Sequence, residues 1–424
     1  MNAEQVINSI KSGVANKDFE LLYQKNVDAV SRYVAAGLRF IEIFGNSENV
    51  RIFTAPGRTE VGGNHTDHQH GRVLAGSVDL DIIGFVAPNN ENVVRIKSEG
   101  FKMDTINLDD LEINKSEYGK AISLIRGMCA CFKEKGYKIG GFDAYTTSNV
   151  LKGSGLSSSA AFEVFIGTVL NNLFNYGEVS PIEIAKSAQR AESVYFGKPC
   201  GLLDQSASAL GGFTFIDFND TTNPIVENIS FDLDKCNHVL CVVNTGGNHA
   251  NLTQDYADIT VECKQISNYF NKDVLRDVNE DEFFNKIGEL KNMFGDRAVL
   301  RAMHFFSEDA RVVDEKQSLI DNDFDKFLCL VKQSGDSSYK YLQNTYSTSA
   351  LNEQGINVAL ALTERFLGSK GACRVHGGGF AGTIQCYIPS DMIDDYKQMI
   401  EKVFGLNSCY VLKIRSVGGY EIKL

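Results

Sequence analysis

The sequence predicts an α+β fold with two or three domains. At 424 residues, 43% of them apolar, the chain can bury a large core, and domains average about 150 residues. Segments typical of strands occur around residues 50–87, 237–244 and 372–388, whereas residues 253–365 are typical of charged amphipathic helices. Because strands and helices do not alternate regularly, this mixture favours α+β over repeated βαβ units.

The first predicted elements are two strands, at Val50–Thr54 and Asp81–Ala87. A helix is expected to begin in the serine run before residue 160. Apolar residues follow that run at the i, i+3, i+4, i+8 spacing of an amphipathic helix, namely Ala161, Val164, Phe165 and Val169.

A second helix carries a complete N-terminal signature. Ser180 is a typical N-cap, Pro181 suits the first helical position, and Glu183 completes a capping box. The helix is expected to end near Gly197, because glycine is favoured just past a helix C-terminus.

A domain boundary is predicted in the stretch Asp217–Lys235, which is rich in Asp and Asn and lies between two strand-like segments. It would divide an N-terminal domain, residues 1–220, from a C-terminal domain, residues 221–424. The elements expected after it are a strand at Asn237–Asn244, helices over Thr253–Arg365, and a glycine-interrupted strand and turn at Ala372–Ile388.

Composition excludes several classes of protein. The polar N-terminus has no signal-like apolar region, and the sequence contains no apolar run long enough to span a membrane, so we expect a cytoplasmic protein. The ten cysteines are scattered without CxxC spacing and are expected to be reduced. A net charge of −12 argues against nucleic acid as a partner, but backbone amides could still bind a small anion. The oligomeric state is left open.

The segment from Gly153 to Ala161 predicts an anion site. Its glycines allow tight backbone geometry and it runs directly into a helix, so the amides of the loop and of the helix N-terminus converge. The residues concerned are Gly153, Ser154, Gly155, Leu156, Ser157, Ser158, Ser159 and Ala160. No Walker A lysine follows, so amides and hydroxyls would hold the phosphates. The alternative is a Gly/Ser turn that only caps the helix.

A second polar segment, Ala55–Leu74, contains three histidines, His65, His68 and His70, among glycines. One interpretation is a metal site, but the HxxHxH spacing is not a familiar zinc pattern and no cysteine is nearby. The favoured interpretation is a polar loop that contacts hydroxyl groups. A solvated hairpin connection is the third alternative.

Two acidic residues sit among small and apolar neighbours. Asp204 follows Leu202 and Leu203, and Glu192 lies on the flank of the preceding helix's apolar stripe. A buried carboxylate is costly unless paired, so each is expected to have a partner. A divalent cation suits Glu192, and arginine or backbone amides are the alternatives for either acid.

The fourth segment is Gly371–Gly382, which contains three consecutive glycines between strand-like residues. Such glycines indicate close approach of another backbone or of a ligand.

Together these segments resemble the GHMP kinases and, within them, the galactokinase family. GRTEVGGNHTDHQHGRVL is similar to the galactokinase signature, SGLSSSAAFEV to the phosphate loop, CGLLDQ to the catalytic segment and RVHGGGFAGT to the C-terminal glycine motif. All four occur in the family's order. The resemblance implies a two-domain α+β fold with the active site in the cleft between domains. It also implies transfer of the ATP γ-phosphate to the anomeric hydroxyl of galactose.

The resemblance also assigns roles to individual residues. Asp204 would lie by the sugar's O1 as a general base or electrostatic partner, with Arg58 between it and the γ-phosphate. Ser159 and Glu192 match magnesium ligands. The positions matching sugar contacts are Asn64, His65, Asp67, Asp204 and Tyr256.

The chain departs from the family pattern at Asn64, where galactokinases have glutamate against the sugar's 6-hydroxyl. Asn64 could still hold a hydroxyl, or it could tolerate a carboxylate that glutamate would repel. The run from His65 to Gln69 is also similar to plant galacturonokinases. Leu151 replaces the usual proline of the phosphate loop, a change we expect to be tolerated.

Three alternatives to a galactokinase therefore stay open. A kinase for galacturonate or another galactose-like sugar would prefer that substrate in a panel. A non-enzymatic sugar and ATP sensor on the same scaffold would release no ADP. A zinc-binding module using the histidines would purify with zinc.

Overall fold

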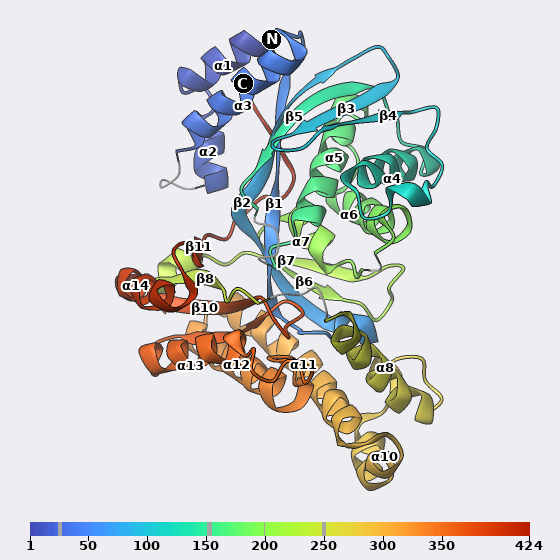
Figure 1. The fold of residues 1–424 in the computed structure, drawn as a ribbon, viewed down its shortest axis with the longest axis vertical. Helices are drawn as coiled ribbons and strands as arrows, with labels where there is room; N and C mark the ends of the chain where they lie inside the picture. Colours follow the sequence, from blue (N-terminus) through green and yellow to red (C-terminus); the bar gives the residue numbers. More distant parts are fainter. Residues whose placement is uncertain (24–27, 151–154, 199, 248–251) are drawn as a thin grey trace.

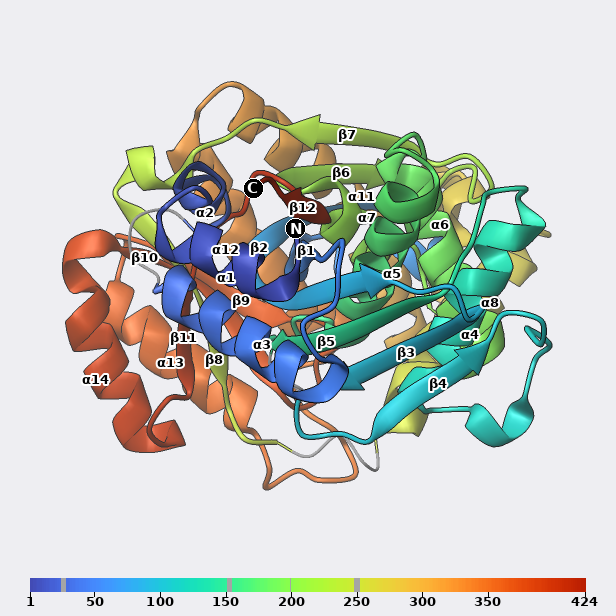
Figure 2. The ribbon, with the colours of Figure 1, turned by 90° about the horizontal axis from the view of Figure 1, so that it is seen from above.

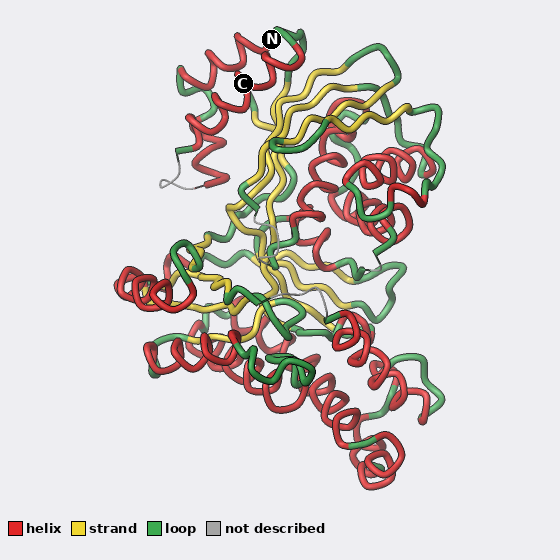
Figure 3. Tube along the Cα trace, in the orientation of Figure 1, coloured by secondary structure: helices red, strands yellow, loops and turns green. Residues whose placement is uncertain are grey.

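The computed structural model describes residues 1–23, 28–150, 155–198, 200–247 and 252–424. Its strands form two sheets, a larger one in the upper half of Figure 1 and a smaller one below it. Helices flank the strands in both halves, as the red and yellow trace of Figure 3 shows. The arrangement confirms the predicted α+β class.

The larger sheet has eight strands in the described part of the chain. Its main path runs β12-β1-β2-β5-β3-β4, with β6 beside β2 and β7 beside β6. All pairs are antiparallel except β3 with β5. The strands are β1 (Arg51–Gly62), β2 (Arg72–Pro88), β3 (Val93–Ser98), β4 (Met103–Asn107), β5 (Phe142–Ser148), β6 (Phe213–Asp217), β7 (Ile225–Ile229) and β12 (Tyr420–Ile422).

Helices cover both faces of this sheet (Figures 1 and 2). One face carries α1 (Ala3–Lys11), α2 (Asn16–Tyr23) and α3 (Ala29–Phe44), whose apolar residues pack on Ile52, Ile83 and Phe85 of the strands. The other face carries α4 (Ala121–Glu134), α5 (Ser158–Phe174), α6 (Pro181–Arg190) and α7 (Leu203–Leu210).

The smaller sheet has the antiparallel order β11-β8-β10-β9. Its strands are β8 (His238–Asn244), β9 (Ala372–His376), β10 (Thr383–Pro389) and β11 (Cys409–Leu412). The helices of this half are α8 (Thr253–Tyr269), α9 (Glu280–Asn285), α10 (Ile287–Phe294), α11 (Asp296–Ile320), α12 (Phe324–Ser337), α13 (Gly355–Leu367) and α14 (Ile393–Phe404). The elements predicted after residue 237 are thus confirmed.

Two predictions about the first half were wrong in part. The helix that starts in the serine run, α5, is buried on every side from Ala160 to Asn171, so it is a central helix and not an amphipathic one. Ala55–Leu74 is not mainly a loop, since β1 continues to Gly62 and β2 begins at Arg72. The alternation in this part of β1 is one of burial, since Arg58 and Glu60 are half-buried while Thr59 and Val61 are buried, and it is not visible as a polar and apolar alternation in the sequence.

The capping signature of α6 is confirmed at its N-cap. The Ser180 hydroxyl accepts a hydrogen bond from the Glu183 amide at 3.3 Å, and Pro181 is the first helical residue. The predicted capping box was wrong in its second half, because the Glu183 carboxylate pairs with Lys135 at 2.7 Å instead of accepting from the Ser180 amide. The helix continues as a π-helical turn, Ala191–Phe196, and ends at Gly197 as predicted.

The boundary at residue 220 remains a prediction. Strand β7 lies beyond it in the sequence yet pairs with β6 of the larger sheet. The last strand, β12, also returns to that sheet and pairs with β1. The chain therefore contributes to the larger sheet from both sides of the predicted boundary.

The ten cysteines are free, and seven of them are buried. Across the described ranges, no helix combines the length and apolar character that a membrane span needs.

Asp81 anchors the N-terminal helices to the larger sheet. It is fully buried in β2 and accepts hydrogen bonds from Arg32 of α3 at 2.5 Å and from Tyr23 of α2 at 2.5 Å. Arg415, also fully buried, contacts the same carboxylate at 3.0 Å. Burial alone would raise the pKa of Asp81, but Arg32 and Arg415 hold it below its ordinary value.

Asp81→Asn should therefore lower the free energy of unfolding by about 3–5 kcal/mol, because it leaves two arginines without their buried counter-charge. Urea denaturation measures the loss. Asp79→Asn is the matched control, since burial raises the pKa of Asp79 to about 6 and its charge therefore stabilises the fold less. Equal losses in the two variants would contradict the anchoring role.

Candidate active site

The N-terminus of α5 forms the anion-binding half of the site. Gly155 (φ +73) and Ser157 (φ 57) both adopt left-handed backbone conformations just before the helix begins at Ser158. The amides of the first helical turn have no intrahelical acceptor and, with the helix dipole, favour a bound anion. Gly153 and Ser154 of the predicted loop lie outside the described residues.

This loop rests on β1. The Arg58 amide donates to the Leu156 carbonyl oxygen at 3.0 Å, and Arg58 Nη1 donates to the Gly155 carbonyl oxygen. Side chains larger than glycine would not fit here, since a Cβ at Gly57 would lie 2.8 Å from the Leu156 oxygen. The close packing fixes the start of α5 relative to Arg58.

Asp204 and Arg58 form an ion pair in front of that helix. Arg58 Nε and Nη2 both lie 2.6 Å from Asp204 Oδ1, while the Ser157 hydroxyl donates to Oδ2. The Asp204 side chain is 27% exposed, so it still faces the open side of the site. Burial tends to raise the pKa of Asp204, but Arg58 and the Ser157 hydrogen bond outweigh it and lower that pKa.

Glu192 lies on the π-helical turn Ala191–Phe196, against the first turn of α5. Its Oε1 accepts a hydrogen bond from the Ser159 hydroxyl at 2.9 Å and lies 3.0 Å from Lys198 Nζ. Gln205 Nε2 donates to Oε2 at 2.7 Å. π-Helical turns often occur at functional sites because they redirect a side chain.

The donor set of Ser159 and Glu192 fits a magnesium ion. Mg²⁺ prefers oxygen ligands and is usually bound by one or two protein groups together with the phosphates of a substrate. The Glu163 carboxyl group is buried beside this pair, and its Oε1 has no hydrogen-bond partner among the described residues. The pair lies beside the helix N-terminus that would hold those phosphates.

The remaining predicted residues gather around the glycine turn that follows β9. His65 Nε2 donates to the Gly378 carbonyl oxygen at 2.9 Å, and the Tyr256 hydroxyl donates to the Gly379 oxygen at 2.9 Å. The His65 and Tyr256 rings stack with centroids 6.4 Å apart. A Cβ at Gly378 would collide with the Tyr256 ring, which confirms the close approach expected of this motif.

Asp67 lies against the loop that leads into α7. A Cβ at Gly201 would lie 2.5 Å from Asp67 Oδ2, so the segment that contains Asp67 meets the segment that contains Asp204. The Asp67 side chain is 19% exposed.

Asn64 is fully buried, and its amide already has protein partners. Nδ2 donates to Glu60 Oε1 at 2.8 Å and to the Gly377 oxygen at 2.7 Å, while Oδ1 accepts from Asn344 at 2.7 Å. Its direct contact with a ligand remains a prediction.

The three histidines do not converge on one point with other metal ligands. Burial lowers the pKa of His65 to about 4, and its ring is bonded to Gly378 as described above. His65 and His68 have ring centroids 6.2 Å apart. Across the described residues, no group of three or more His, Cys, Asp or Glu side chains is placed to hold a metal ion.

Sequence reasoning missed two residues that shape the site. Gln205 holds Glu192 through its amide, and its position next to Asp204 was the available signal. Glu60 shares a strand face with Arg58, because side chains alternate along β1. The strand is irregular on both sides of this stretch, between Pro56 and Arg58 and between Glu60 and Gly62. Such bulges redirect side chains near active sites.

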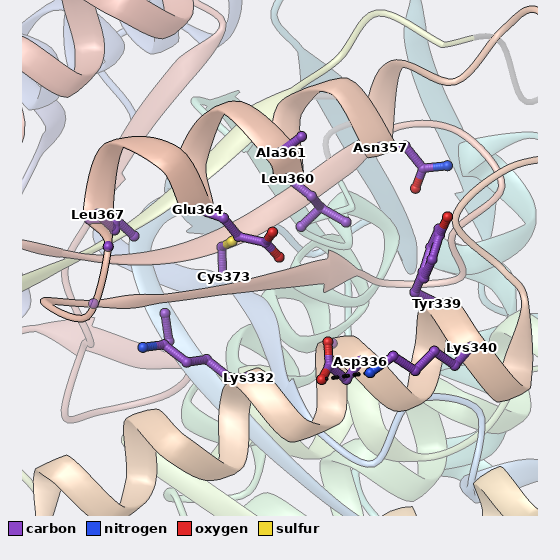
Figure 4. A pocket seen from close by; sticks show the side chains of 14 residues that line it. Lys332, Asp336, Tyr339, Lys340, Asn357, Leu360, Ala361, Glu364, Leu367 and Cys373 are labelled. Carbon is purple, nitrogen blue, oxygen red and sulfur yellow. Dashed lines mark hydrogen bonds and ion pairs between the residues drawn. The ribbon is translucent and has the colours of Figure 1, made fainter.

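A separate groove lies between α12, α13 and β9 (Figure 4). Its volume is about 680 Å³, and Lys332 of α12 faces Glu364 of α13 across it. Asp336 and Lys340 on its wall pair with each other at 3.0 Å. It contains none of the predicted site residues.

The main site combines an anion-binding helix end, an ionised carboxylate held by arginine, and an oxygen pair suited to magnesium. This set is sufficient for phosphoryl transfer, which depends on positioning and charge neutralisation. Polar side chains and backbone from both halves of the molecule meet beside it, where a hydroxyl-rich acceptor could lie.

Two family models and two curated relatives that match this chain are of galactokinases or of GHMP kinases. Residues 123–212 match the family described as GHMP kinases N terminal domain, and residues 38–88 match the galactokinase galactose-binding signature. The galactokinase of Glaesserella parasuis serovar 5 is 30% identical over 85% of this chain and 91% of its own length. The galactokinase of Clostridium tetani is 29% identical over 90% of this chain and 96% of its own length.

Solved structures show the same fold. The Lactococcus lactis galactokinase complexed with galactose superposes with a TM-score of 0.77 at 24% identity, covering 92% of this chain and 99% of the other. The mevalonate kinase of Methanococcus jannaschii gives a TM-score of 0.61 at 16% identity, covering 87% and 99%.

Proposed function

Because this chain belongs to the galactokinase family of GHMP kinases, we propose that it transfers the γ-phosphoryl group of ATP to the anomeric hydroxyl of galactose. The products are galactose 1-phosphate and ADP. The observation that carries this proposal is the Asp204 carboxylate held between Arg58 and Ser157, directly in front of the α5 N-terminus.

Asp204 orients the anomeric hydroxyl and accepts its proton. As the sugar oxygen bonds to the γ-phosphorus, the bond from that phosphorus to the bridging oxygen breaks and ADP leaves. A carboxylate with a lowered pKa is a weak base, which suits a loose transition state in which positioning matters more than proton abstraction. Arg58 keeps Asp204 ionised and adds positive charge beside the transferred group.

The phosphates are held by the amides of Leu156 to Ala160 and by the Ser158 hydroxyl, since the hydroxyls of Ser157 and Ser159 donate to Asp204 and Glu192. Ser159 and Glu192 would hold Mg²⁺, whose chemistry when bound is to neutralise phosphate charge. Gln205 keeps the Glu192 carboxylate turned toward Ser159.

His65, Asp67 and Tyr256 contact the sugar hydroxyls. Their convergence on the glycine turn at 377–379 and on Gly201 supports this assignment. We place the reaction in the cytoplasm, a reducing compartment in which the ten free thiols would persist.

Arg58 should control the pH dependence of catalysis. Since Asp204 must be ionised, log kcat/KM falls as pH drops through its pKa, which lies below the ordinary value in the native protein. In Arg58→Met the positive charge is lost and burial raises that pKa, so the acid limb should move to higher pH. Arg51→Met, which removes another arginine of β1 from its ion pair with Glu421, should leave the limb in place. If the acid limb of the pH profile of Arg58→Met lay at the same pH as in the wild type, a group other than Asp204 would be responsible for the loss of activity at low pH.

A sugar panel tests the proposed function. ADP release with MgATP is measured for galactose, glucose and galacturonate at matched concentrations. We expect the highest kcat/KM with galactose. No sugar-dependent ADP release, or a clear preference for galacturonate, would overturn the proposal.

A further inference from the structure

Glu60 lies in the sugar half of the site, on the same face of β1 as Arg58. Its side chain is 13% exposed, whereas Asn64 is completely buried. Burial raises the pKa of Glu60, while Arg374 and Arg58 lower it and the Asp67 carboxylate raises it. Asn64 Nδ2 donates both to Glu60 Oε1 at 2.8 Å and to the Gly377 oxygen at 2.7 Å, so Glu60 lies beside the glycine turn that His65 and Tyr256 also contact.

One oxygen of Glu60 is held by the protein. Oε1 accepts hydrogen bonds from Asn64 Nδ2 at 2.8 Å and from Arg374 Nη2 at 2.8 Å. Arg374 is fully buried, and its other nitrogens donate to the carbonyl oxygens of Val61 and Val375. Every hydrogen bond that the described residues make to this carboxylate is on Oε1, so Oε2 is the oxygen left for a ligand.

Asn64 is poorly placed to bind the substrate itself. Both hydrogens of its amide are donated within the protein, to Glu60 and to the Gly377 oxygen. Contact with a sugar hydroxyl would require breaking one of these bonds and exposing a buried group. The carboxylate that the family pattern places at position 64 is instead available four residues earlier.

We propose that Glu60 is the specificity-determining carboxylate for the sugar's 6-position and that Asn64 is its positioning residue. This inference rests on the proposed function. Glu60 Oε2 accepts a hydrogen bond from the 6-hydroxyl of galactose, while Asn64 and Arg374 fix Oε1. A substrate with a carboxylate at this position is repelled.

The surrounding arginines do not reverse this preference. The Arg374 guanidinium is fully buried and donates to the Val61 oxygen as well as to Glu60. The Arg58 guanidinium donates to Asp204 and to the Gly155 oxygen. Of these two arginines neither is free to pair with a galacturonate carboxylate, which would instead lie beside the like charges of Glu60 and Asp67. Like charges at a binding contact cost several kcal/mol, or at least about 100-fold in affinity.

The test compares kcat/KM for galactose, 6-deoxygalactose and galacturonate in the wild-type chain, Glu60→Gln and Glu60→Asp. The wild type should prefer galactose over both analogues by at least about 100-fold. Glu60→Gln should raise the galacturonate-to-galactose ratio at least about tenfold, with the loss for galactose mainly in KM. Glu60→Asp keeps the negative charge on a shorter side chain, so it should still reject galacturonate while binding galactose more weakly.

Glu227→Gln removes an ion-paired carboxylate of β7, remote from the site, and should leave all ratios unchanged. A wild-type chain that phosphorylates no galactose would refute the proposed function. Two outcomes would overturn only the role of Glu60. One is a wild-type chain that uses galactose and 6-deoxygalactose equally well. The other is a galacturonate-to-galactose ratio of kcat/KM that is the same in Glu60→Gln as in the wild type. If Glu60→Gln does not fold, loss of galacturonate rejection in Glu60→Asp would overturn it instead.

Discussion

Replacing Asp204 with asparagine is expected to lower kcat for galactose by about 10³-fold, within the range for loss of a catalytic acid or base. Asparagine has nearly the same shape and can still accept the hydrogen bond from Arg58, so the geometry of the pair survives. What is lost is the negative charge that orients the anomeric hydroxyl and receives its proton. Steady-state ADP release measures kcat, and calorimetry should find ATP affinity little changed.

Asp217→Asn is the matched control for this variant. Asp217 is also a mostly buried carboxylate paired with arginines, Arg72 and Arg276, both at 3.0 Å, but it lies outside the site. Its kcat should stay within a few-fold of the wild-type value. If Asp204→Asn kept more than about a tenth of wild-type kcat, Asp204 would not have the catalytic role assigned to it.

Glu192→Gln is expected to lower kcat at least about 100-fold and to raise the Mg²⁺ concentration needed for half-maximal activity. Glutamine keeps the hydrogen bond from the Ser159 hydroxyl but removes the charged oxygen offered to the ion. A second readout does not depend on turnover. The gain in nucleotide affinity that Mg²⁺ produces in calorimetry should shrink in this variant.

Glu163→Gln provides the comparison. Its carboxyl group lies 3.2 Å from the same Gln205 amide, but burial and the neighbouring Glu192 raise its pKa well above the ordinary value. A neutral acid and a neutral amide differ little, so activity should change only a few-fold. A larger loss in Glu163→Gln than in Glu192→Gln would reassign the metal ligand.

Much of the fold could be predicted because its signals are local. The N-cap at Ser180, the strand at His238–Asn244 and the glycine-interrupted hairpin of β9 and β10 follow from turn chemistry and periodicity. The burial of α5 on all sides could not be predicted, because it depends on strands and helices that are far away in the sequence. The return of β12 to the first sheet is likewise a long-range pairing with β1.

The proximity of the candidate residues was predictable where the family resemblance covers whole segments. The loop before α5, Asp204 and Glu192 lie in such segments, and the structure places them together with Arg58, while their roles remain predictions. The partners of Asn64 were not predictable, because Asn344 and Gly377 are about 300 residues away in the chain and meet it only through the fold. Because Asn64 is completely buried, Glu60 is the carboxylate nearest to it that can contact a ligand. Nothing in the local sequence distinguishes Glu60 from other acidic residues in strands.

If this chain phosphorylates galactose at its anomeric oxygen, the position of the phosphate in the product must show it. Galactose is incubated with MgATP and the product is examined by phosphorus and proton NMR. We predict one sugar phosphate, formed in equimolar amount with ADP, whose phosphorus couples to the anomeric proton. Coupling to a proton at another carbon, or ADP formed without a sugar phosphate, would mean that the chain is not an anomeric galactose kinase.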